Sequence, residues 1–542
     1  MSPLIPLGLL LAGTAVLLVS LSPRFPYAGG SAAITAALAC LATLVLGWRL
    51  PVQAELSAWG QVGLLRNNLQ LSVDGAAWLP ALATTMMCLA ALLTGLARPG
   101  GQRLAPRAAS LLLTFAGLAA LFADNLVTLV MAWAGLDFIY FLTLILLARG
   151  EGVQPQAALH LTFNSLGTLF ALAAALLVSR ERVDLTLHAA ITAPGSALLM
   201  TLAAVFRLGL FPLHLGLPVE ANIRQGLGLL LRLIPAAVAL MAVARLAAFG
   251  FAEGLRPWLT AFGVAALLVG SAQLWSSPEP RQGLTFVVIA QSGLALLVGL
   301  WGGAQALSGV IAQTLTLLLG SALVFLANGY DELRPWASVL PGLGVAILAG
   351  VPATVGFVGL NVLYSRLLDP GHWALWLALA GVVVAQAVLV GGLLRAVAWP
   401  GDPIEGGAPG LAGYVTGLAL LGVFGVLPGV AVEQFGGIMG VAHAGVLGLE
   451  AAPNWIALGV SLAAALAGAG LWRFETVVRG RTESAAQFVT ALLRLDWLYR
   501  LAWGAVRVVD RLMFHLAGVL EGEGALLWAL VVALAVMLLF RG

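Results

Sequence analysis

The sequence contains no lysine, and only 9% of its 542 residues are charged. A soluble domain usually carries about a quarter charged residues, so this chain cannot cover itself with a water-soluble surface. Its two cysteines, Cys40 and Cys88, both lie in apolar runs and cannot supply an iron-sulfur cluster. The formal charge of +3 comes from scattered arginines, which argues against a nucleic-acid partner. With no glycine-rich nucleotide loop and no hydrolytic constellation, we expect no cofactor, no metal and no redox or hydrolytic site in this chain.

The sequence consists largely of long apolar runs, with 61% hydrophobic residues and a mean hydropathy of +1.03. Runs of roughly 20 residues recur along the whole chain, and each can cross a hydrocarbon core about 30 Å thick. A spanning segment must satisfy its own backbone polar groups, and the runs are too uniformly apolar for barrel strands. The fold class is therefore an all-α integral membrane protein.

About 16 transmembrane helices are predicted by runs bounded by charge, proline or polar clusters. They are expected at residues 4–22, 30–48, 76–97, 108–123, 126–148, 157–179, 196–217, 226–249, 258–276, 283–301, 304–327, 340–366, 373–397, 409–430, 455–473 and 523–541. The first run has no basic residue before it and no cleavage pattern after it, so we interpret it as a retained helix. The weak stretch 436–448 is either a half-helix or part of a loop.

The arginines are distributed unevenly between the loops on the two sides of the membrane that these spans would cross. Most fall on the face opposite the N-terminus, so the positive-inside rule places both termini outside. A different pattern covers residues 484–520, where arginines and aspartates alternate with apolar and aromatic residues such as Trp497 and Trp503. This spacing predicts an amphipathic helix that lies on the membrane surface or clamps neighbouring helices, with a solvated linker helix as the alternative.

Ionisable residues inside spans cost about 2.5 to 3.5 kcal/mol each on insertion scales, so they are candidates for function. The clearest are Asp137, His160, Arg207 and Arg232. The alternative for Asp137 and Arg207 is a purely structural pair that holds two helices together.

Two spans are predicted to be broken. Residues 206–218 contain Pro212, His214 and Pro218 with two glycines, and residues 350–361 contain Pro352 and several glycines. Proline and glycine at this density interrupt a helix, and interrupted helices mark ion sites in transporters. Because the two lie five spans apart, they indicate two inverted five-helix repeats.

At this level of detail the chain resembles a known family. Residues 69–75 (Leu-Gln-Leu-Ser-Val-Asp-Gly) look like a family strand and its entry into segment three, and 133–137 (Trp-Ala-Gly-Leu-Asp) like its Trp-x-Gly-Leu-Glu. The 206–218 run, residues 281–293 and segment twelve match further motifs in the same order. Over about residues 65 to 400 the chain is similar to the antiporter-like membrane subunits of the NADH:quinone oxidoreductase (complex I) superfamily. That superfamily includes Mrp antiporter, group 4 hydrogenase and inorganic-carbon transporter subunits.

The resemblance implies a central line of ionisable groups that moves protons between two half-channels. It places an acidic-lysine pair on segments five and seven, a lysine or histidine on segment eight, and further charges on segments eleven and twelve. Here these positions hold Asp137, Arg207, Arg232, Ser321 and Leu360. Arginine effectively never releases its proton, so the relay is predicted to be altered or partly lost.

Other side chains near this line remain candidates. His160 and His214 can titrate, and the neutral second-half residues can order water; these are Gln291, Gln313, Ser321, Asn361 and Gln386.

We therefore expect a membrane subunit of a complex I-like or hydrogenase-like ion-translocating assembly in a bacterial or archaeal cytoplasmic membrane. Its partners would be other membrane-arm or hydrophilic subunits, the lipid bilayer, and protons or monovalent cations. An autonomous cation/proton antiporter and a non-transporting anchor or coupling partner are the alternatives. The expected layout is N-terminal helices at 1–107, repeats at 108–250 and 251–400, additional helices at 401–483, the surface helix at 484–522 and a last span at 523–542.

Overall fold

The structure is a computed structural model that divides into two units, residues 1–481 and 482–542, each considered by itself. It describes residues 3–21, 29–56, 68–98, 104–148, 153–180, 185–193, 195–211, 213, 225–327, 338–368, 373–400, 407–440 and 452–479, with isolated positions after 500. The expected surface helix at 484–522 and the expected span at 523–541 lie outside these continuous stretches, as does His214.

Helices make up nearly all of the described chain. They are α1 (Leu4–Leu21), α2 (Gly29–Leu46), α3 (Gly75–Thr94), α4 (Leu104–Leu121), α5 (Leu126–Leu147), α6 (Val153–Arg180), α7 (Leu187–Thr192), α8 (Ser196–Leu208), α9 (Gln225–Phe249), α10 (Arg256–Ser276), α11 (Leu284–Trp301), α12 (Ala306–Leu315), α13 (Ser321–Leu326), α14 (Val339–Ala349), α15 (Val355–Leu367), α16 (Trp373–Ala398), α17 (Gly407–Val430), α18 (Val432–Ile438) and α19 (Ala452–Arg473). A π-helical turn, η8 (Thr316–Gly320), joins α12 to α13.

Within the described residues, twelve helices are long and apolar enough to cross a membrane, and α1, α8, α14 and α15 are shorter apolar helices. Every span expected from 4–22 to 455–473 overlaps at least one of them. The weak stretch from 436 begins inside the short helix α18 and continues beyond the described residues. The chain is thus a multi-pass helical membrane protein, as predicted.

In both spans that were predicted to be broken, the helix ends at a glycine inside the span, and residues 212 and 214–224 of the first lie outside the described part of the chain. Helix α8 ends at Leu208, and Gly209 follows in the left-handed conformation with φ 57°. The span expected at 340–366 is two helices, because Gly350 takes φ 67° at the end of α14 and α15 begins at Val355. The π-helical turn η8 is a third irregularity, which sequence reasoning did not predict; such turns occur frequently at functional sites.

A small hairpin closes one end of the first-half helices. Strand β1 (Val52–Leu56) pairs antiparallel with β2 (Leu69–Val73); β2 was predicted and β1 was not. A single bridge from Leu71 to Ala123 ties the hairpin to the segment between α4 and α5, and another from Asn125 to Thr186 joins the starts of α5 and α7. We call this end of the helices the hairpin face.

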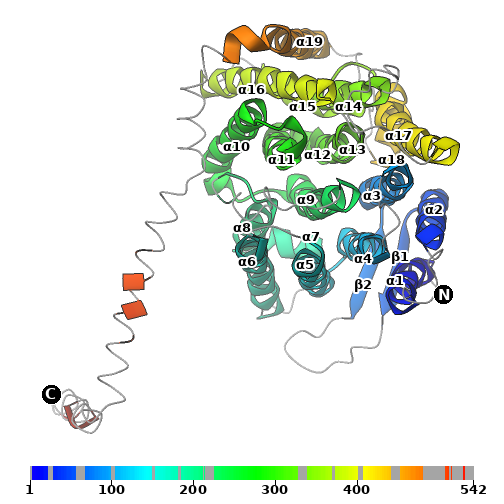
Figure 1. Ribbon diagram of the computed structural model, residues 1–542. Helices are drawn as coiled ribbons and strands as arrows, with labels where there is room; N and C mark the ends of the chain where they lie inside the picture. The colour runs from blue at the N-terminus through cyan, green and yellow to red at the C-terminus, as the bar shows by residue number, and fades with distance from the viewer. Residues whose placement is uncertain are drawn as a thin grey trace. The chain divides into compact units, whose positions relative to one another are not determined.

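Helix α9 lies at the centre of the first unit. It packs against α3, α4 and α8 on one side and against α11 and α12 on the other, so it links the first-half and second-half helices (Figure 1). Nearly every residue of α9 from Leu227 to Leu246 is buried. The outer helices instead expose large apolar side chains such as Leu466, which suits contact with lipid. Charged side chains carried by or facing α9 therefore lie where both halves meet.

Candidate functional site

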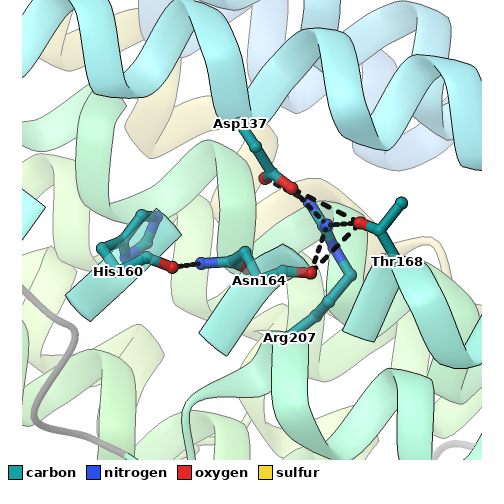
Figure 2. Close-up of polar contacts among 5 residues, drawn as sticks. All are labelled: Asp137, His160, Asn164, Thr168 and Arg207. Carbon is teal, nitrogen blue, oxygen red and sulfur yellow. Dashed lines mark hydrogen bonds and ion pairs between the residues drawn. The ribbon is translucent and has the colours of Figure 1, made fainter. Parts of the chain in front are cut away.

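An ion pair joins α5 to α8 in the interior of the first-half helices. Arg207 Nη2 lies 2.8 Å from Asp137 Oδ1, and Arg207 Nη1 donates to Asp137 Oδ2 at 2.8 Å (Figure 2). The Arg207 side chain is wholly buried and that of Asp137 is 6% exposed. Parallel bonds of this kind match the flat guanidinium to the carboxylate and are stronger than single contacts. The two charged candidates on α5 and α8 therefore lie in direct contact.

Further groups complete the coordination of Arg207. Its Nη1 donates to Thr168 Oγ1 at 2.9 Å and approaches the carbonyl oxygen of Asn164 at 3.4 Å, both on α6. Its guanidinium carbon lies 4.4 Å from the centre of the Trp133 ring, which permits a cation-π contact. Arg207 also occupies the last turn of α8, where the helix dipole favours a cation.

The pair is therefore closed on itself. Both carboxylate oxygens of Asp137 accept from a guanidinium that effectively cannot lose its proton. The same pair is net neutral, which makes burial tolerable in an environment where a lone charge is costly. As arranged, it can hold α5, α6 and α8 together.

A titratable ring lies beside the pair. His160 on α6 stacks on Tyr140 of α5, with ring centres 3.9 Å apart and planes 20° apart, and its carbonyl accepts from Asn164 Nδ2. Both side chains are almost fully buried, and the Tyr140 hydroxyl has no hydrogen-bond partner within the described part of the chain. Sequence reasoning missed Tyr140, although its position one helical turn after Asp137 places both on one face of α5.

Arg232, the third charged candidate, is on α9 and does not pair with Asp137. Its Nε donates to Thr285 Oγ1 of α11 at 2.9 Å, and its Nη1 donates to the Gly228 carbonyl at 3.1 Å. Arg232 thus connects α9 to the second-half helices. We refer to Asp137, Arg207 and Arg232 together as the charged layer.

In the second half, amide side chains converge on the break between α14 and α15. Gln291 of α11 and Gln386 of α16 both donate to the carbonyl oxygen of Leu348, at 3.4 and 2.7 Å. That carbonyl lies in the last turn of α14, where helix carbonyls have no helical partner. The predicted polar residues here therefore brace a broken helix.

The other second-half candidates lie on α12, α13 and α15. Gln313 of α12 packs on Gly359 of α15, since a Cβ placed on that glycine would lie 2.6 Å from Gln313 Nε2. Ser321 follows the π-helical turn directly, and Asn361 is buried in α15. Leu360 is also buried there. All of these side chains are uncharged.

A second charged cluster, which sequence reasoning did not predict, occupies the hairpin face. Asp74 caps α3 by accepting from the amide of Ala77, and its Oδ2 accepts from Arg245 Nη1 of α9 at 2.6 Å. Asp124 lies between α4 and α5 beside this pair. Burial raises the pKa of Asp124; the positive charge of Arg245 opposes the rise, and the negative charge of Asp74 adds to it.

Among the described residues, no three histidine, cysteine, aspartate or glutamate side chains are placed to hold a metal ion.

No protein-family model matches the sequence. Curated relatives are nevertheless found: the chain is 27% identical over 231 residues to NADH-quinone oxidoreductase subunit N of Cutibacterium acnes, covering 36% of this chain and 42% of the relative. It is 26% identical over 257 residues to the subunit N of Acidithiobacillus ferrooxidans, covering 41% and 52%. The chain thus spans about half the length of these relatives.

Three solved structures share the fold over most of the chain. The Mrp complex from Dietzia sp. DQ12-45-1b aligns with a TM-score of 0.78 at 20% identity, covering 98% of this chain and 62% of the other. Respiratory complex I from Thermus thermophilus gives 0.65 at 22%, covering 82% and 100%. The membrane-bound sulfane sulfur reductase, an archaeal respiratory complex, gives 0.70 at 15%, covering 99% of each chain.

These similarities define the class of the protein. It is a multi-pass membrane protein whose fold is shared by chains of an Mrp complex, of a respiratory complex I and of the membrane-bound sulfane sulfur reductase. Within that class its curated sequence relatives carry the name NADH-quinone oxidoreductase subunit N, so the resemblance read from its motifs is confirmed.

Proposed function

We propose that this chain is a membrane subunit of a complex I-like or Mrp-like assembly in which its own proton relay is altered. The observation that carries the proposal is the closed Asp137–Arg207 pair on an antiporter-like fold. A relay needs groups that bind and release a proton in turn, and an arginine locked on both oxygens of its partner does neither. The uncharged amides around Leu348 support the same conclusion for the second half.

In this role the subunit contributes its helices and fixed charges to the assembly. Partner subunits would supply any redox chemistry, and His160 would be a further titratable side chain beside the charged layer. The membrane would be a bacterial or archaeal cytoplasmic membrane, with both termini of the chain outside.

Proton flux through the purified assembly tests the altered relay. A single Asp137→Asn change leaves Arg207 buried without its counter-charge, so the double variant Asp137→Asn/Arg207→Gln, which keeps the layer neutral, is the sharper probe. We expect the double variant to assemble and to move protons within about twofold of wild type, a difference of about 0.4 kcal/mol in barrier height. The matched control is Asp74→Asn, which removes a carboxylate from an ion pair outside the charged layer.

Two results would overturn the proposal. If flux collapses in an intact assembly carrying the double variant while Asp74→Asn retains it, the relay still runs through the pair. If the tagged chain purifies without any partner subunit and its vesicles alone exchange sodium or potassium for protons, the chain is instead an autonomous antiporter.

A further inference from the structure

Two exposed arginines lie against the turn that joins α11 to α12. Arg256, the first residue of α10, donates from Nη2 to the Leu300 carbonyl at 3.0 Å and lies 5.3 Å from the centre of the Trp301 ring. The guanidinium of Arg366 on α15 lies beside Gly303, because a Cβ placed on that glycine would be 3.2 Å from Arg366 Nη2 and 3.6 Å from its Nε. Helix α10 begins shortly after α9 reaches the hairpin face, so both contacts are on that face.

Two exposed tryptophans mark the membrane boundary at the same depth. Trp258 follows Arg256 closely on α10 and is 65% exposed, and Trp376 near the start of α16 is 48% exposed. Helices α10 and α16 pack side by side, and the contacts of Gly381 and Gly392 with α10 show that they run parallel, which places the two tryptophans about level (Figure 1). Tryptophan gathers at the level of the lipid headgroups. The two arginines therefore lie at the headgroup level.

Most hydrogen-bond donors of the two guanidiniums are unused within the described part of the chain. Arg256 donates to one carbonyl and Arg366 donates to none, and neither forms an ion pair with a described residue. Glu253, one turn before Arg256, is exposed and does not pair with it. By contrast, Arg245 and Arg395 each bind a carboxylate. A guanidinium carries five N–H donors in a planar arrangement that fits phosphate oxygens, so these two arginines are suited to an anion from outside the chain.

The outward surface beyond the tryptophans is apolar. Phe262 and Leu268 of α10 and Leu377 and Val384 of the neighbouring α16 are all exposed. A free anion would gain nothing from this surface. A phospholipid places its phosphate at the headgroup level and its acyl chains along the apolar sides of the helices, so it matches both features of this part of the molecule.

We propose that Arg256 and Arg366 form a binding site for the phosphate group of an anionic phospholipid at the hairpin face. Their contact points, Leu300 and Gly303, are three residues apart, which corresponds to about 5–6 Å in a helical turn, so one headgroup can reach both guanidiniums. Gly303 is suited to the site because it has φ 58° and leaves room for the Arg366 guanidinium. The site involves no member of the charged layer, so its test is independent of the proposed function.

Lipid binding by the purified full-length chain tests the site. The chain in neutral detergent is titrated with dioleoyl phosphatidylglycerol, and bound lipid is counted by native mass spectrometry. The double variant Arg256→Gln/Arg366→Gln is compared with wild type and with Arg180→Gln. Arg180 is a matched control because it is an exposed arginine at the end of α6, shortly before Leu185 meets the start of α5 at the hairpin face. A parallel titration with inorganic phosphate distinguishes a lipid site from a site for the free anion.

We expect the double variant to bind phosphatidylglycerol at least about tenfold more weakly than wild type, because it loses the charge-assisted hydrogen bonds of both guanidiniums. Arg180→Gln should stay within about twofold of wild type, since it leaves both guanidiniums of the site in place. Inorganic phosphate should not displace the lipid, because it makes no contact with the apolar surface. If the double variant does not fold, Arg366→Gln alone takes its place, with an expected loss of about threefold.

Three results would contradict the proposal. Wild type and the arginine variant could bind phosphatidylglycerol equally, in which case the arginines hold no headgroup. Arg180→Gln could lose as much affinity as the double variant, which would indicate only a general effect of surface charge. Inorganic phosphate could displace the lipid at equal concentration, which would make the site one for the free anion.

Discussion

Replacing Arg207 by glutamine is expected to destabilise the protein severely. The change leaves the Asp137 carboxylate buried without its counter-charge, and breaking one partner out of a buried ion pair typically costs about 3–5 kcal/mol. The contact between Arg207 and the Trp133 ring is lost at the same time. We therefore expect the free energy of unfolding to fall by about 3–5 kcal/mol, measured by titration of detergent-solubilised protein with sodium dodecyl sulfate and followed by tryptophan fluorescence.

The chain offers a closely matched control. Arg256 also lies over a tryptophan ring, Trp301, and donates to a backbone carbonyl, that of Leu300. It is exposed, however, and has no carboxylate partner among the described residues. Arg256→Gln should therefore cost about 1 kcal/mol or less.

A second comparison isolates the pairing energy. The double variant Asp137→Asn/Arg207→Gln leaves no buried charge, so it should recover more than half of the loss seen in Arg207→Gln. The reasoning is refuted if Arg207→Gln costs no more than Arg256→Gln, or if the losses of the two single variants simply add in the double variant.

Three further changes probe other parts of the structure. Burial raises the pKa of Asp124 in the folded state above its value in the unfolded chain. The contribution of Asp124 to the free energy of unfolding is therefore fully present at pH values below the ordinary carboxyl pKa, and it is lost as the pH rises through the raised pKa. Asp124→Asn should flatten that part of the profile of stability against pH. Gly356→Ala should prevent α14 and α15 from packing, since its Cβ would lie 1.9 Å from the Ile347 carbonyl oxygen, whereas Gly459→Ala, with open space around it, should leave the thermal unfolding midpoint nearly unchanged. Asp74→Asn keeps the helix cap and should cost only about 0.2–1 kcal/mol for its exposed ion pair, while Asp74→Ala should cost about 1 kcal/mol more in the same unfolding assay; equal losses would contradict the capping role.

Much of this fold could be predicted from the sequence because the relevant physics is local. The length of an apolar run determines whether a helix can cross a membrane, and the backbone must then satisfy itself within that run. Glycine and proline likewise report a break where it occurs, as they do at Gly209 and Gly350. The strand β2 and the capping role of Asp74 follow from a short contiguous motif.

Contacts between distant segments had to come from the tertiary structure. Asp74 and Arg245 are far apart in sequence, and nothing local to either residue indicates that the ends of α3 and α9 meet. The convergence of Gln291 and Gln386 on one carbonyl likewise depends on how α11, α14 and α16 pack. The strand β1 was missed for the same reason, since it exists by pairing with β2.

The charged layer shows which features of the site could be predicted from the sequence and which depended on the tertiary structure. Residue type and run length were enough to place Asp137, Arg207 and Arg232 in apolar runs that can cross a membrane. That arginine stands where a group able to release a proton would lie is what the family resemblance implies. Only the tertiary structure decided that Arg207 donates to both oxygens of Asp137 while Arg232 donates to Thr285. The reason is that the packing of α5, α8 and α9 determines which guanidinium can reach the carboxylate.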